Sequence, residues 1–107
     1  MHKDFFTFRN IDAFLQSMPI PIPDLQLSTQ GSRQMVWDIV RRKWIVLTPE
    51  EMVRQAMLHF LHYHLQYPIN WMAVEKQIQV NGLKKRFDIL VYDKTMKPRI
   101  MVECKAP

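Results

Sequence analysis

The chain has 107 residues, 48% of them hydrophobic, and a formal net charge of +5, which suits one globular domain with a core of its own. A single cysteine excludes an internal disulfide, and no apolar run approaches the roughly 20 residues of a membrane span, so we expect a cytoplasmic protein without a membrane partner. The basic balance favours nucleic acid as a partner, although a solvated basic surface explains the charge equally well.

The N-terminal half predicts a β-ribbon. Residues 1–18 form an ambiguous extension in which Asn10 is placed to cap a short helix, and the prolines at 19, 21 and 23 keep the next segment extended. Two alternating runs, 25–29 and 34–40, flank Gly31-Ser32, and a turn at 41–43 leads to a third run at 44–47. We therefore expect a ribbon over residues 24–47.

The next segment has the signals of a helix start. Thr48 is in the N-cap position, Pro49 in the first helical position, and Glu51 three residues after the cap, as in a capping box. Apolar residues follow at helical spacing and predict one buried stripe over a helix of about 49–66: Val53, Ala56, Met57, Phe60 and Leu61.

Three strands are expected after the helix. Residues 72–80 alternate, Asn81-Gly82 is a tight-turn signal, and the runs 86–92 and 100–105 are joined by a polar loop at 93–98. The order of ribbon, helix and three strands predicts an α+β (α/β) fold in a single domain of residues 1–107.

The last two strands place two carboxylates opposite each other. If Tyr92 lies opposite Arg99 in an antiparallel hairpin, Asp88 lies opposite Glu103, with Cβ atoms roughly 4.5–5.5 Å apart. Such a pair destabilises a sheet unless something positive lies between the two groups, and a divalent metal is the usual solution. Lys105 shares the face of Glu103, whereas Cys104 points into the core. The competing role for Asp88 is an ion pair with Lys85 or Arg86.

The pattern of Asp88, fourteen residues, then Glu103-x-Lys105 resembles the PD-(D/E)XK nuclease superfamily. The segments 47–55, 81–89 and 102–107 look like small bacterial proteins related to the N-terminal nuclease domain of type I restriction enzyme R subunits. This restriction-modification resemblance covers about residues 20–107. It implies a restriction-endonuclease-like core with a mixed β-sheet over 48–107.

The sequence departs from the family pattern in two places. Phe87 replaces the usual proline before the first Asp, and the sequence given stops two residues after Lys105. We therefore expect a partial catalytic core that lacks its usual C-terminal part. A homodimer or a partner subunit is expected to cover the open sheet.

The resemblance also implies a chemistry. Asp88, Glu103 and the backbone carbonyl of Cys104 would hold Mg²⁺ or Mn²⁺, and Lys105 would orient or deprotonate a water that attacks a phosphodiester bond of nucleic acid, with DNA preferred. The alternatives are an inactive nucleic-acid-binding or interaction module with the nuclease fold, and a structural domain whose acidic pair is incidental.

The family often adds a site carboxylate on the first helix. A helical wheel puts Glu50 beside Met57 and Leu61 on the buried stripe, so Glu50 is the tentative site residue and Glu51 the better cap.

A histidine cluster and two basic runs are weaker candidates for functional sites. The cluster of His59, His62 and His64 suggests a metal tract, but the wheel puts His59 and His62 toward solvent and His64 on the buried stripe, which disfavours zinc. The basic runs 41–43 and 84–86 fit solvated faces or turns, and Lys84, Lys85 and Arg86 are also candidates for phosphate contacts.

Overall fold

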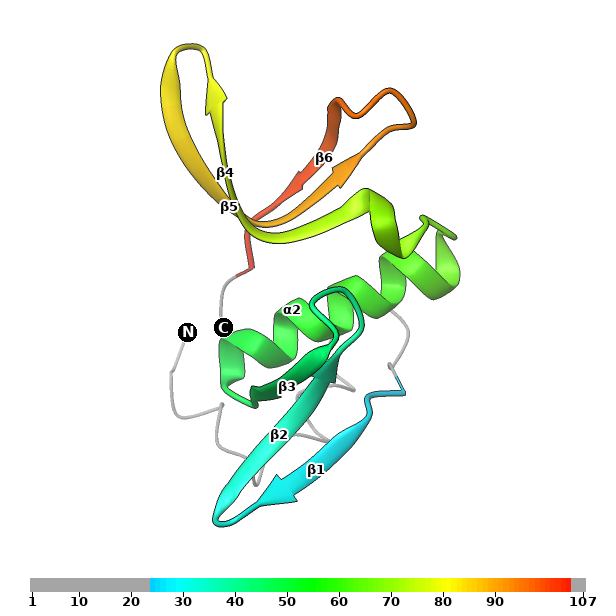
Figure 1. The fold of residues 1–107 in the computed structure, drawn as a ribbon, viewed down its shortest axis with the longest axis vertical. Helices are drawn as coiled ribbons and strands as arrows, with labels where there is room; N and C mark the ends of the chain where they lie inside the picture. Colours follow the sequence, from blue (N-terminus) through cyan, green and yellow to red (C-terminus); the bar gives the residue numbers. More distant parts are fainter. Residues whose placement is uncertain (1–23, 105–107) are drawn as a thin grey trace.

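The structure is a computed structural model that describes residues 24–104. Lys105 and the N-terminal extension at 1–18 therefore lie outside the described residues, as does the proline segment that follows the extension. The fold is α+β, with one helix between two small sheets (Figure 1). Its elements in chain order are β1 (Leu27–Gln30), β2 (Arg33–Asp38), β3 (Lys43–Val46), α2 (Pro49–His59), a π-helical segment η3 (Phe60–His64), a 3₁₀ turn η4 (Ile69–Trp71), β4 (Met72–Val80), β5 (Leu83–Tyr92) and β6 (Pro98–Val102).

The first sheet is the predicted ribbon. Its strands pair in the order β1-β2-β3, both pairings are antiparallel, and the first turn is at Gly31, whose φ of 64° suits glycine. Trp37 and Trp44 lie opposite each other on β2 and β3 with their rings edge to face, 5.4 Å between centroids. Such aromatic cross-strand pairs help to fix the register.

The second sheet has the order β4-β5-β6. Asn81 and Gly82 both have positive φ, 52° and 78°, as a tight hairpin turn between β4 and β5 requires. All pairings between the described strands are antiparallel, which differs from the mixed sheet that the resemblance implied. The irregularity between Val91 and Tyr92 puts Tyr92 opposite Pro98 and not Arg99, yet Ile89 to Val91 keep the predicted register.

Helix α2 begins as the sequence predicts, because the Thr48 hydroxyl accepts a hydrogen bond from the Glu51 amide at 3.1 Å. The α-helix ends at His59, earlier than expected, and continues as one wider turn in which the Leu65 amide donates to the Phe60 carbonyl at 3.1 Å. No helix within residues 24–104 is long and apolar enough to cross a membrane.

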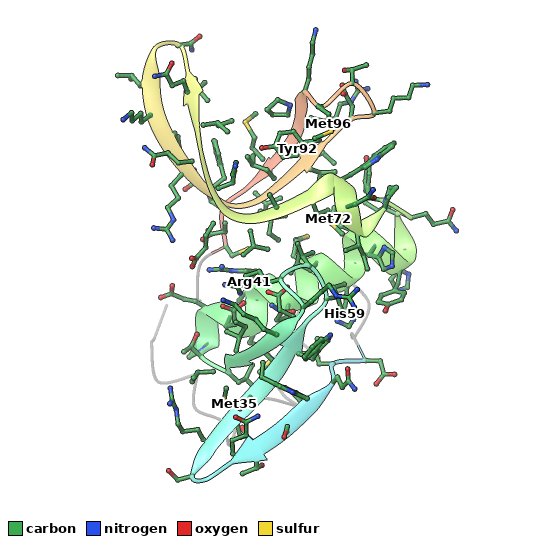
Figure 2. All side chains as sticks on the ribbon, in the orientation of Figure 1. Met35, Arg41, His59, Met72, Tyr92 and Met96 are labelled. Atoms are coloured by element: carbon green, nitrogen blue, oxygen red, sulfur yellow. The ribbon has the colours of Figure 1, made fainter. Side chains whose placement is uncertain are left out.

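The helix is buried on two sides. Leu58 and Leu61 pack with Ile89 and Val91 of the second sheet, with Met72 at the start of β4 in the same cluster. Met52 packs on the other side against the first sheet, in a cluster with Val36 and Leu47. The side chain of Met72 is labelled at the start of β4 in Figure 2. A helix covered by two layers has more than one buried stripe, and this arrangement determines which of its polar residues are removed from water.

A buried aspartate holds the turn between β2 and β3. Asp38 is fully buried and accepts hydrogen bonds from the amides of Val40 and Arg41, from Nε of Arg41 and from Nε2 of Gln55, at 2.7–2.8 Å. Burial alone would raise the pKa of Asp38, but the hydrogen bonds from Arg41 and Gln55 outweigh it and hold the pKa below its ordinary value. Arg41 is thus part of this turn and not a solvated side chain, and Figure 2 shows it beside α2.

Replacing Asp38 by asparagine is expected to lower the free energy of unfolding by about 2 kcal/mol at neutral pH, because charge-assisted hydrogen bonds to Arg41 are lost. In the wild type the contribution of ionised Asp38 is present above its unfolded pKa, near 3.8, and is lost as the pH falls through the lower folded value. Urea unfolding as a function of pH measures both effects. Equal stability of Asp38→Asn and the wild type at pH 7 would contradict this role.

Candidate functional site

Asp88 lies at the junction of β5 and the end of β6. Ile89 and Val102 form the last pair between β5 and β6, so Asp88 lies beside the point where the chain leaves the sheet toward Glu103. Oδ2 of Asp88 accepts a hydrogen bond from the backbone amide of Cys104 at 2.6 Å. The carboxylate therefore fixes the chain immediately after β6, beside Glu103.

Glu103 has a different partner. Its carboxylate lies 3.1 Å from the ammonium of Lys85, and both side chains are about half exposed. Among residues 24–104, no group of three or more His, Cys, Asp or Glu side chains is arranged to hold a metal ion. The carboxylates of Asp88 and Glu103 thus bind different groups of the chain, the Cys104 amide and the Lys85 ammonium.

Cys104 turns toward the core, as predicted. Its side chain packs against the cluster of Leu58 and Ile89, together with Ile100 and Val102. Burial, reinforced by the nearby Asp88 carboxylate, raises the pKa of the Cys104 thiol to about 11. The thiol is therefore protonated at neutral pH and is not a nucleophile.

The central cation of the site is Arg54, which the sequence analysis did not predict to be a site residue. Only 8% of its side chain is exposed, and its guanidinium lies 3.2 Å from Glu75, 3.6 Å from Glu51 and 3.6 Å from Asp88. Arg54 thus joins helix α2 to both β4 and β5. The spacing of Glu51 and Arg54, three residues apart on a helix, was the only local signal, and it predicts nothing about the two carboxylates from the sheet.

Glu75 is the second residue that was missed. It falls opposite Asp88, because Val74 pairs with Ile89 and Lys76 with Phe87. Hydrogen bonding to Arg54 is the main cause that lowers the pKa of Glu75, and Arg86 contributes from 2.7 Å. The φ of Glu75 is 54°, a left-handed conformation that is unfavourable for a residue with a Cβ and that often occurs at functional sites.

The predicted burial of the two helix glutamates was reversed. Glu50 is exposed, whereas Glu51 is buried and accepts hydrogen bonds from Nη2 of Arg41 and Nε2 of Gln55, both at 3.0 Å. The reason is that the helix has two buried sides, so the face that the wheel left to solvent is the one that packs under the turn between β2 and β3. The Glu51 amide donates to the Thr48 hydroxyl that caps the helix, and the Glu51 carboxylate contacts Arg41, Gln55 and Arg54.

The predicted burial of His59 and His64 was also reversed. His59 is buried, and burial lowers its pKa, whereas His64 is exposed. Nδ1 of His62 lies 2.8 Å from the carbonyl oxygen of Tyr67, so this ring is engaged by the backbone after η3. The three rings do not form a metal-binding group within the described residues.

The donors of the candidate metal site fit a hard cation in their chemistry. Mg²⁺ binds through one or two carboxylates and keeps several waters, and Asp88 and Glu103 are carboxylates of this kind, one bound to the Cys104 amide and the other in the residue before it. Glu103 would have to exchange its contact with Lys85 for the metal. Lys84, Lys85 and Arg86 are all exposed on β5, which leads away from this point.

Comparison with protein families matches residues 49–107 to the type I restriction enzyme R protein N terminus (HSDR_N). Comparisons with curated proteins and with solved structures give no significant match. The matched region is more than half of the chain and contains α2, the second sheet and every carboxylate that contacts Arg54. The chain therefore belongs to the family of the type I restriction enzyme R protein N terminus.

Proposed function

We propose that the chain is a metal-dependent nuclease-type domain that hydrolyses phosphodiester bonds of DNA. The observation that carries this proposal is the hydrogen bond from the Cys104 amide to Asp88, which brings Asp88 on β5 to the chain segment of Glu103 just after β6, within the region that matches the restriction enzyme family. Asp88 is held in place by the Cys104 amide on Oδ2 and by the Arg54 guanidinium 3.6 Å from Oδ1, so the direction of its carboxylate is defined. The restriction-endonuclease-like core belongs to the same proposal.

The residues have distinct roles in this proposal. Asp88 and Glu103 would hold Mg²⁺ or Mn²⁺, with the Cys104 carbonyl oxygen as a further ligand. The bound ion would lower the pKa of a water ligand and offset the charge that develops on the phosphate. Lys105 would orient or deprotonate the attacking water, and Arg54 would keep Asp88 in position from the helix.

A second candidate is supported by a specific observation. Arg54 already lies among three carboxylates, and Lys85 already neutralises Glu103. An acidic site neutralised by its own cations needs no metal to be stable. On this reading the chain is an inactive nucleic-acid-binding or subunit-interaction module with the nuclease fold.

Metal removal separates the two candidates. With Mg²⁺ or Mn²⁺ the protein is expected to nick supercoiled plasmid DNA, and excess EDTA is expected to reduce nicking to the level of a protein-free control. DNA binding without nicking under any metal condition would support the inactive module. Nicking that persists in EDTA would contradict metal dependence.

A further inference from the structure

The tip of the β4–β5 hairpin, residues 76–86, extends away from α2 and from the rest of the fold (Figure 1). We call this segment the arm. Most of its residues are exposed, and the Leu83 side chain near its turn is 73% exposed. A two-stranded arm that buries so little of itself is a candidate contact surface and not a core element.

The arm is strongly basic. It contains four cationic residues and no acidic one, in a chain whose formal net charge is +5: Lys76, Lys84, Lys85 and Arg86. Lys85 and Arg86 pair with carboxylates at the base of the arm, whereas Lys76 and Lys84 make no ion pair with any residue in the range 24–104. The charge of the arm complements a polyanion.

The strand register gives the arm two different faces. Gln77 pairs with Arg86 and Gln79 with Lys84, so side-chain alternation places two amides and two cations on one face. All four residues are exposed. Arg86 and Asp88 are two apart on β5 and share that face, so this polar surface runs directly into the candidate site.

We infer that the arm enters the major groove of B-form duplex DNA with the face of Gln77, Gln79, Lys84 and Arg86; this rests on the proposed function. The groove, about 12 Å wide, admits a two-stranded ribbon, whereas the major groove of A-form RNA is too narrow. Glutamine amides pair with adenine edges, and arginine and lysine pair with guanine edges or phosphates.

The test is the salt dependence of binding to a fluorescent 20-base-pair DNA duplex in EDTA, where no cleavage occurs. The double variant Lys84→Gln/Arg86→Gln, which removes both cations of this face, is expected to weaken binding about tenfold near 0.1 M salt and to reduce the slope of log K against log salt by about two. Lys94→Gln/Lys97→Gln is the matched control, because it removes the same charge from exposed positions in the other hairpin. Circular dichroism confirms that both variants are folded.

Each result has a clear meaning. Absence of DNA binding by the wild type, or equal effects of the two double variants, would overturn the arm proposal. Arm-dependent binding of duplex RNA as tight as that of DNA would overturn the major-groove assignment. If DNA binding depends on the arm but the protein never cleaves DNA, the arm proposal is supported and only the nuclease proposal is contradicted. If the protein cleaves DNA with metal but binding does not depend on the arm, the nuclease proposal is supported and the arm proposal is contradicted.

Discussion

Replacing Arg54 by methionine is expected to lower the free energy of unfolding by about 3 kcal/mol, because it removes a buried cation from among three carboxylates. Glu51, Glu75 and Asp88 would then face one another without their shared counterion. This loss of unfolding free energy is at the lower end of the range for breaking a buried ion pair, because each carboxylate retains another partner. These partners are Arg41 for Glu51, Arg86 for Glu75 and the Cys104 amide for Asp88. Urea or thermal unfolding at neutral pH measures it.

Arg99→Met is the matched control for this substitution. Arg99 is exposed on β6 and makes no ion pair with the residues that the structure describes, so its replacement is expected to change stability by less than about 0.5 kcal/mol. Arg54→Lys should give an intermediate loss, because an ammonium cannot reach three carboxylates as a planar guanidinium does. Equal stability of the Arg54→Met and Arg99→Met variants would show that the network does not stabilise the fold.

Local signals were sufficient for most of the secondary structure. The turns at Gly31 and at Asn81-Gly82 require positive φ, and the Thr48 cap satisfies an amide that the helix itself leaves free. These features depend on a few adjacent residues, so they could be predicted without knowing the tertiary structure. The register of Ile89 to Val91 against Ile100 to Val102 was also local, because a short loop joins the two strands.

The burial of the helix could not be predicted in the same way. A helical wheel assumes one buried face, but α2 packs between two sheets, which buries Glu51 and His59 on the side predicted to be exposed. Which carboxylates meet Arg54 depends on the docking of α2 against β4 and β5. That docking is a property of the whole fold, and no spacing in the sequence contains it.

The hydrogen bonds and ion pairs of Gln55 and Arg54 make the candidate site dependent on both halves of the fold. Gln55 contacts Asp38 and Glu51, and Arg54 continues from Glu51 to Glu75 and Asp88. The position of Asp88 is thus coupled through α2 to the turn between β2 and β3. We therefore expect the N-terminal ribbon to support the site although the family match begins only at residue 49.

Replacing Asp88 by asparagine is expected to reduce metal-dependent cleavage of DNA by at least about 10³-fold, equivalent to ~4 kcal/mol of transition-state stabilisation. The substitution removes the negative charge that would bind the metal ion. It retains a side-chain oxygen that can accept the hydrogen bond from the Cys104 amide, so the end of β6 should keep its place. Lys105→Ala is expected to abolish cleavage as well, through loss of the group that acts on the water. Initial rates of plasmid nicking measure both effects.

Asp93→Asn is the matched control for Asp88→Asn. Asp93 also anchors a turn through its carboxylate, which accepts hydrogen bonds from the amides of Thr95 and Lys97, but it lies in the loop after β5 and contacts no residue of the Arg54 network. Its replacement should leave the nicking rate unchanged. If Asp88→Asn and Lys105→Ala both nick DNA at the wild-type rate, the activity comes from another site or a contaminant, and the nuclease assignment fails. If Asp88→Asn alone is inactive and remains folded, the carboxylate itself is required, because the hydrogen bond to Cys104 is the feature that the two proteins share.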